Sequence, residues 1–99
     1  MSREMLKDNP LVSYCLFTYN QEAYVRESLE AALAQTYSPL EIIVSDDCSS
    51  DGTVRVLREV IAAYTGEHRV VLNVNKENLG IGAHVSKVMI ELSSGDYMI

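Results

Sequence analysis

Apolar runs alternate along this chain with segments in which apolar residues recur every three or four positions. The first pattern predicts strands and the second predicts helices. Because the strand runs are almost continuously apolar, they are typical of a parallel sheet with helices on both faces. We expect strands over Leu11–Thr18, Leu40–Ser45, Arg69–Asn75 and Asp96–Ile99, and helices over residues 21–35, 53–64 and 82–92.

The connections between these strands predict how the strands are ordered in the sheet. Each connection contains a helix, so each is expected to be a right-handed crossover between parallel strands. The pattern predicts an α/β protein, a three-layer sandwich with a mostly parallel, Rossmann-like sheet of strand order 3-2-1-4. In such sheets ligands bind at the carboxyl ends of the strands, beside the point where the order reverses.

The chain stops inside the fourth expected strand, without a turn, a cap or a polar tail. Residues 1–10 are expected to form an N-terminal tail, and residues 11–99 one unit without a repeat or a linker. We therefore expect a fragment of a longer protein. The truncated edge of its sheet is a candidate surface for self-association.

Charge narrows the classes of ligand. The formal net charge of −6 argues against nucleic acid, which requires a basic surface. A phosphate-bearing ligand would need local N–H donors, a basic side chain or a divalent cation. No apolar stretch approaches the roughly 18 residues of a membrane span, and no signal peptide is visible. The two cysteines are too few for a disulfide framework, and free thiols favour a cytoplasmic protein, in solution or at the cytoplasmic face of the membrane.

Candidate chemistry lies at the end of the second strand, where Asp46 and Asp47 precede a Ser/Gly-rich turn. Adjacent carboxylates repel each other and are costly to desolvate unless hydrogen-bond donors meet them. The pair is therefore a candidate for ligand hydroxyls, base N–H groups or a metal ion; the simpler interpretation is that both are turn residues. After the first strand, Asn20 is expected to cap a helix and Glu22 to lie in its first turn.

In combination, these residues resemble the N-terminal half of family 2 glycosyltransferases, which have the GT-A fold. The resemblance covers residues 11–99. Each motif is weak alone, but their order and spacing together are specific. The motifs are Thr18-Tyr19-Asn20 with Glu22, Gln35-Thr36-Tyr37, Glu41-Ile42-Ile43-Val44 with Asp46-Asp47, Ser49 with Asp51-Gly52-Thr53, Asn78-Leu79-Gly80, and Gly95-Asp96-Tyr97.

The resemblance implies a nucleotide-sugar site above the first two strands. Thr18 and Tyr19 would lie along the base and ribose, and Asp47 would accept a hydrogen bond from a base N–H. An acceptor aimed at an imide N–H selects uracil-like edges, so a UDP-linked donor is expected. The nucleotide-binding residues are then Thr18, Tyr19, Asn20, Glu22, Asp46, Asp47, Gly80 and Lys87.

The chain departs from the family pattern at two places. Phe17 stands where the family usually has Pro, and Val85-Ser86 stand where Arg-Asn is common. A basic contact to the diphosphate would then have to come from Lys87 or His84. His84 alone is more often a surface or partly packed histidine.

In this family the strand that begins at Gly95 should continue into an Asp-x-Asp motif, which binds Mg²⁺ or Mn²⁺ through the donor's diphosphate. The chain ends before that motif, and the catalytic base comes later still. No catalytic and no metal-binding residue is therefore assigned here, and the fragment alone is expected to be inactive.

Two classes of function stay open. The first is the donor-binding half of an enzyme of polysaccharide or cell-envelope biosynthesis, with a saccharide, lipid or protein acceptor. The second is a non-catalytic nucleotide-binding or interaction module of the same fold. A receiver-type domain fits less well, because its acidic pair follows the first strand.

Overall fold

The computed structural model describes residues 10–89 and 97–98, the last two by their backbone only. It has the α/β architecture expected from the sequence. A four-stranded sheet has the order β3-β2-β1-β4, and its described pairings are all parallel. The elements are β1 (Val12–Thr18), α2 (Val25–Leu33), β2 (Leu40–Asp46), α3 (Thr53–Ala63), β3 (Arg69–Val74), α4 (Ile81–Lys87) and β4 (Tyr97–Met98).

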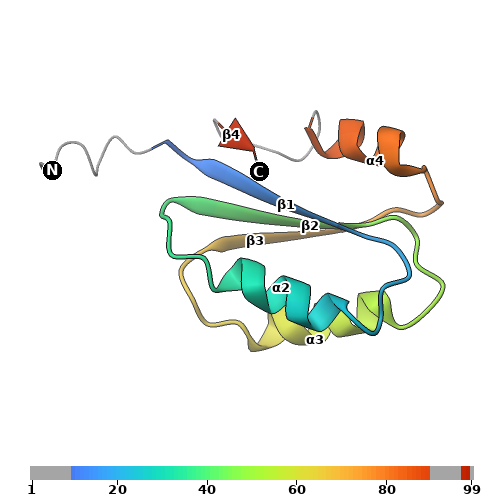
Figure 1. Ribbon diagram of the computed structural model, residues 1–99, viewed down its shortest axis with the longest axis horizontal. Helices are drawn as coiled ribbons and strands as arrows, with labels where there is room; N and C mark the ends of the chain where they lie inside the picture. Colours follow the sequence, from blue (N-terminus) through green and yellow to red (C-terminus); the bar gives the residue numbers. More distant parts are fainter. Residues whose placement is uncertain (1–9, 90–96, 99) are drawn as a thin grey trace, which may run out of the picture.

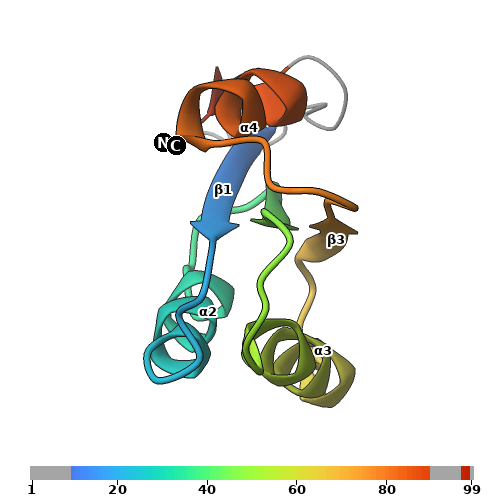
Figure 2. The ribbon, with the colours of Figure 1, turned by 90° about the vertical axis from the view of Figure 1, so that its right-hand side faces the viewer.

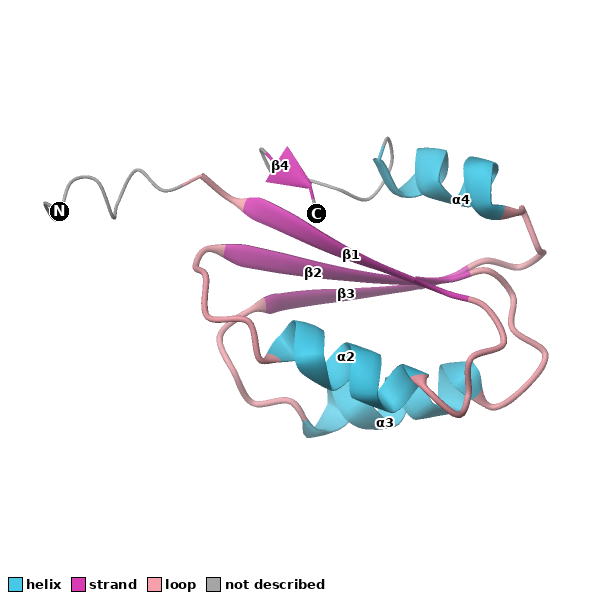
Figure 3. Ribbon diagram, viewed as in Figure 1, coloured by secondary structure: helices cyan, strands magenta, loops and turns pink. Residues whose placement is uncertain are grey.

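The helices form two layers around the sheet. Helices α2 and α3 lie side by side on one face, and α4 lies on the other face, as Figure 2 shows most clearly. Figure 3 shows the same arrangement from the side, with the three long strands running in one direction between the helical layers. The chain passes from β1 to β2 to β3 and then returns to the far side of β1 (Figure 1). The order of the strands therefore reverses beside β1.

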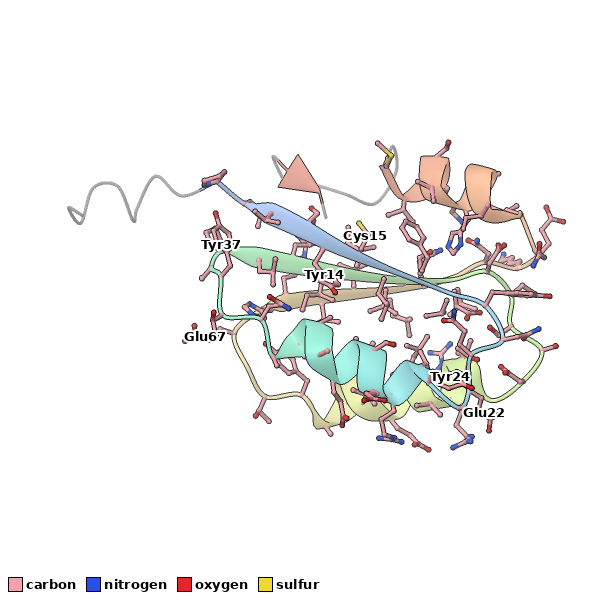
Figure 4. All side chains as sticks on the ribbon, in the orientation of Figure 1. Tyr14, Cys15, Glu22, Tyr24, Tyr37 and Glu67 are labelled. Atoms are coloured by element: carbon pink, nitrogen blue, oxygen red, sulfur yellow. The ribbon has the colours of Figure 1, made fainter. Side chains whose placement is uncertain are left out.

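The core lies between the sheet and the α2/α3 layer. All seven residues of β2 are buried, which agrees with its central place in the sheet. Leu29 of α2 and Leu57 of α3 are completely buried in one cluster with Ile42 and Val44. Successive strand residues point to opposite faces, so Tyr14 packs against this cluster, whereas Cys15 lies on the other side of β1 (Figure 4).

Helix α2 begins later than the apolar spacing indicates, at Val25 and not at Gln21. Asn20 does not cap it, which corrects the prediction from the sequence: its φ of 48° is left-handed, and its side chain bonds to another loop. Glu22 likewise precedes the helix, and the acid in the first turn is Glu27. Tertiary hydrogen bonds thus outweigh the local preference for capping.

The expected fourth strand and third helix are confirmed only where the structure describes them. Strand β4 is seen as Tyr97–Met98, paired with β1. Helix α4 is assigned over Ile81–Lys87 and continues as a π-helical turn through residues 88–89; residues 90–92 of its expected span fall outside the described residues. The N-terminal tail up to residue 9 also falls outside them. Within the described part, no helix is long and apolar enough to cross a bilayer.

Candidate functional site

Asp46 is the last residue of β2 and is completely buried. Its Oδ1 accepts hydrogen bonds from Thr18 Oγ1 at 2.7 Å and Ser49 Oγ at 2.6 Å. Its Oδ2 accepts the backbone N–H of Ser49 at 2.7 Å. Three donors therefore meet this carboxylate, and they tie the end of β1 to the turn after β2. Its partners are all internal to the protein.

Asp47 is buried as well, but its donors come from the residue that follows β3 and from the loop that leads to α4. Its Oδ1 accepts Asn75 Nδ2 at 2.9 Å and the Leu79 N–H at 2.8 Å, and its Oδ2 accepts the Gly80 N–H at 2.9 Å. Burial raises the pKa of this carboxyl, but the bonds from Leu79, Asn75 and Gly80 outweigh burial and hold the pKa below its ordinary value. A carboxylate has about four acceptor positions, so Oδ2 can accept one further donor.

Asn20 and Glu22 join two loops to each other. Asn20 Oδ1 accepts the Ser50 N–H at 2.8 Å, and Glu22 Oε1 accepts the Gly52 N–H at 2.8 Å. In the same stretch, the Gln21 N–H donates to Thr53 Oγ1 at 2.8 Å. The loop after β1 is thus bonded to the loop after β2 at three successive residues. We call this set of contacts the loop clamp, and Figure 4 shows Glu22 at the end of the molecule where β1–β3 end.

A pocket of about 340 Å³ lies at the carboxyl end of β1, beside the loop that leads to α4. It is bounded by apolar and polar side chains from β1, the end of β2 and the start of α4. Its lining consists of Phe17, Thr18, Tyr19, Gln21, Asp47, Asn78, Gly80, Ile81 and His84.

The structure separates the residues that the resemblance implied for the nucleotide. Thr18, Tyr19, Asp47 and Gly80 come together in this pocket. Asp46 is fully buried and does not line it. The others lie elsewhere: Asn20 and Glu22 line a different hollow beside Asp51, and Lys87 lines one beside Asn75.

His84 is buried in the wall of the pocket, with only 3% of its surface exposed. Its Nε2 lies 2.7 Å from Ser45 Oγ, and the ring of Phe17 meets its ring edge to face at 5.1 Å. Burial lowers the pKa of His84, and the nearby ammonium of Lys87 acts in the same direction; the carboxylates of Asp47 and Asp46 oppose this only in part. His84 is therefore neutral at pH 7. It does not supply the positive charge that the sequence assigned to it as an alternative to Lys87.

Lys87 points away from the pocket into a group of amides on β3 and the residue that follows it. Its Nζ donates to Asn75 Oδ1 at 2.7 Å, and Asn73 Nδ2 donates to the same oxygen at 2.9 Å and to Ser45 Oγ at 2.9 Å. Sequence reasoning missed these two asparagines. The signal was present, because polar side chains at alternate positions of an apolar strand share one face.

The two aspartates do not fit a metal site. Each already accepts three hydrogen bonds from the protein, which leaves too few free oxygen positions for a hard cation. No group of three or more His, Cys, Asp or Glu side chains that could hold a metal ion occurs in the part of the chain that the structure describes.

Comparison with solved structures finds the same fold in a protein of low sequence identity. A mannosyltransferase from Pyrobaculum calidifontis, solved in complex with GDP-Man and Mn²⁺, superposes with a TM-score of 0.82. The match covers 94% of this chain and 27% of that one, at 23% sequence identity. It shows the GT-A fold of a glycosyltransferase.

Among curated proteins, EpsE of Bacillus subtilis strain 168 is 34% identical over 93 residues, which are 94% of this chain and 32% of that protein. The chondroitin synthase of Escherichia coli is 38% identical over 93 residues, covering 94% of this chain and 13% of that enzyme. The chain thus spans about a third or less of the length of these relatives. The model of the family described as glycosyl transferase family 2 matches residues 13–99. The chain belongs to glycosyl transferase family 2.

Proposed function

We propose that this chain is the donor-binding half of a glycosyltransferase, and that the pocket beside Asp47 takes the base and ribose of a UDP-linked sugar. The enzyme would transfer the sugar to a saccharide, lipid or protein acceptor in polysaccharide or cell-envelope synthesis, in the cytoplasm or at the cytoplasmic face of the membrane. The observation that carries the proposal is the buried Asp47 carboxylate, which lines the pocket and keeps one acceptor position free.

The position of the pocket supports this. It lies at the carboxyl end of β1, where the strand order reverses, and ligands of open parallel sheets bind at such points. Tyr19, with 48% of its surface exposed, can cover the face of a base or ribose. The loop clamp and the hydrogen bonds of Asp46 hold both loops in place before any ligand arrives.

The charges around the pocket favour the uncharged part of the donor. Among its lining residues His84 is neutral, and none carries a positive charge. Lys87 is bonded to Asn75 outside the pocket. The base and ribose therefore suit this pocket, whereas the diphosphate would need a cation. We expect Mg²⁺ or Mn²⁺ to supply it, held by ligands beyond the described residues.

The test is calorimetric titration of the full gene product with UDP, for the wild type and for Asp47→Ala and Asp47→Asn. Loss of a charge-assisted hydrogen bond costs about 1.5–3 kcal/mol, which is roughly ten- to a hundredfold in affinity. Asn keeps the shape of Asp but presents its own N–H to the N–H of the base. Asp47→Asn should therefore lower the affinity for UDP by a similar factor. Glu77→Gln, which removes an exposed acid outside the pocket, should leave the affinity unchanged.

A change in the ligand separates base recognition from damage to the loop. UDP methylated at N3 of uracil has no N–H for Asp47, so the wild type should bind it weakly and the Asp47 variants should lose nothing further. GDP also has a ring N–H beside a carbonyl and would bind in place of UDP if the donor is a guanosine nucleotide. Equal UDP affinity in all variants would show that Asp47 is a turn residue.

The second candidate is a non-catalytic nucleotide-binding module of the same fold. It is favoured by one observation: the carboxylates of Asp46 and Asp47 are both engaged in hydrogen bonds within the protein. The two candidates differ in turnover. A module would bind UDP with the same dependence on Asp47, but the full gene product would transfer no sugar.

A further inference from the structure

One hydrogen-bonded chain runs from Lys87 to the pocket through side chains of β3 and β2. It connects Lys87 Nζ to Asn75 Oδ1, Asn73 Nδ2 to Asn75 Oδ1 and to Ser45 Oγ, and Ser45 Oγ to His84 Nε2. Asn73 and Asn75 can hydrogen-bond to each other because side chains two residues apart in a strand lie on the same face of the sheet. The direction of every bond in this chain can be derived from its charged end.

Asn75 lies between two charges that leave it a single orientation. The ammonium of Lys87 can only donate, so it faces the amide oxygen of Asn75. The carboxylate of Asp47 can only accept, so it faces the amide nitrogen. With its Oδ1 fixed, Asn75 requires a donor from Asn73, and that donor is Nδ2.

The same orientation passes on to His84. Ser45 Oγ accepts from Asn73 Nδ2, and its own hydroxyl proton, buried with a residue that is only 1% exposed, still needs an acceptor. An amide nitrogen cannot accept, so among the described partners of Ser45 that acceptor is His84 Nε2. A ring nitrogen that accepts a hydrogen bond carries no hydrogen of its own. In a neutral imidazole the hydrogen is then on the other nitrogen, Nδ1. Burial lowers the pKa of His84 and so disfavours the doubly protonated ring, which agrees with this tautomer.

Among the described residues, Nδ1 has no hydrogen-bond partner, although only 3% of the His84 surface is exposed. Completely enclosed polar side-chain atoms without a hydrogen bond are absent from the described residues, so Nδ1 must reach accessible space. The space that His84 lines is the pocket beside Asp47. An N–H with no partner therefore adjoins the site where the nucleotide is proposed to bind.

We propose that His84 is a specificity-determining residue, which donates a hydrogen bond from Nδ1–H to an acceptor atom of the bound base next to the N–H that Asp47 accepts. This rests on the proposed function. The pocket would then offer one acceptor and one neutral donor, which together match an N–H beside a carbonyl, as in uracil or guanine. The Ser45–Asn73–Asn75 chain holds the ring in the tautomer that makes this possible.

The tautomer is measured directly. In the full gene product with ¹⁵N-labelled histidine, the long-range ¹H–¹⁵N spectrum should show a pyrrole-type Nδ1 and a pyridine-type Nε2 for His84, with His84→Gln used to assign the signals. Ser45→Ala removes the proton donor to Nε2 and should move the signals toward the other tautomer. A protonated Nε2 in the wild type at pH 7 would overturn the inference, whatever the variants bind.

Two substitutions separate the donor from the fold. His84→Asn places an amide nitrogen near the position of Nδ1 and should keep UDP affinity. His84→Gln keeps an acceptor for Ser45 but has no donor toward the pocket, so its affinity should fall roughly two- to tenfold. Wild-type affinity in His84→Gln would overturn the inference. If the wild type binds no UDP and no GDP, the proposed function fails, and the ligand assigned to His84 fails with it.

Discussion

At the scale of single residues, Asp46 and Asp47 are adjacent in the sequence and have the same side chain, yet their surroundings differ. Asp46 is enclosed by Thr18 and Ser49, and its oxygens accept bonds only from the protein. Asp47 faces the loop before α4, lines the pocket, and has an acceptor position to spare. The repulsion expected between the two charges is offset because each meets its own set of donors.

The hydrogen bonds of Asp47 should be visible in acid. Because its folded-state pKa lies below the ordinary value of 3.8, ionised Asp47 stabilises the fold above about pH 4, and this contribution is lost as the pH falls through the folded-state pKa. Urea unfolding between pH 6 and pH 2.5 should therefore show a steeper decline in unfolding free energy for the wild type than for Asp47→Asn.

The matched control is Glu67→Gln, which removes an acid at the opposite end of the molecule (Figure 4). Glu67 is exposed, and no hydrogen bond of its side chain is seen in the described structure. The slope of this variant should follow the wild type. Parallel slopes for Asp47→Asn and the wild type would contradict a lowered folded-state pKa for Asp47.

At the scale of elements, the two loops that follow β1 and β2 are hydrogen-bonded to each other beside the pocket. The loop clamp joins Asn20, Gln21 and Glu22 to residues 50–53, which places the ends of β1 and β2 in a fixed relation. Gly52 is part of this contact, because a Cβ there would lie 2.7 Å from the Glu22 carboxylate. The motif residues Asn20, Glu22 and Gly52 thus all take part in joining the two loops.

We expect Gly52→Ala to push the Glu22 carboxylate aside and break its bond to the N–H of residue 52. Each of Gly52→Ala and Glu22→Ala should then lower the unfolding free energy by about 0.5–1.5 kcal/mol, the net value of one such hydrogen bond. The unfolding free energy of the double variant should be no lower than that of the less stable single variant, because both changes remove the same contact. Additive losses in a urea-unfolding double-mutant cycle would show that the two residues act independently.

At the scale of the whole molecule, the described residues form a pocket with walls from β1, the end of β2 and the start of α4. The buried carboxylates of Asp46 and Asp47 each accept three hydrogen bonds from within the protein, and no metal cluster is found in residues 10–89. The relatives that this chain matches are about three or more times as long. Under the proposed function, this chain would bind the donor, and the catalytic base and the metal ligands would come from further sequence.

We therefore expect the purified 99-residue chain to release no nucleoside diphosphate from UDP-sugars. A full gene product that extends beyond it should do so only when Mg²⁺ or Mn²⁺ is present, because the diphosphate leaving group needs a cation. Coupled detection of released UDP, with and without a chelator, measures both. Turnover by the 99-residue chain alone would refute the expectation that catalysis needs further sequence.

The sequence by itself determined the elements and their order in the sheet. Apolar runs and helical spacing are local patterns, and right-handed crossovers leave few ways to connect them. The family resemblance also implied that Thr18 and Asp47 share a site, and both line the same pocket, because strand ends in parallel sheets meet at one edge. Tertiary structure alone decided the rest: Asn20 bonds across to Ser50 and caps nothing, and Lys87 turns toward Asn75. These outcomes depend on partners that lie 12 or 30 residues away, and local patterns carry no information about such distant donors and acceptors.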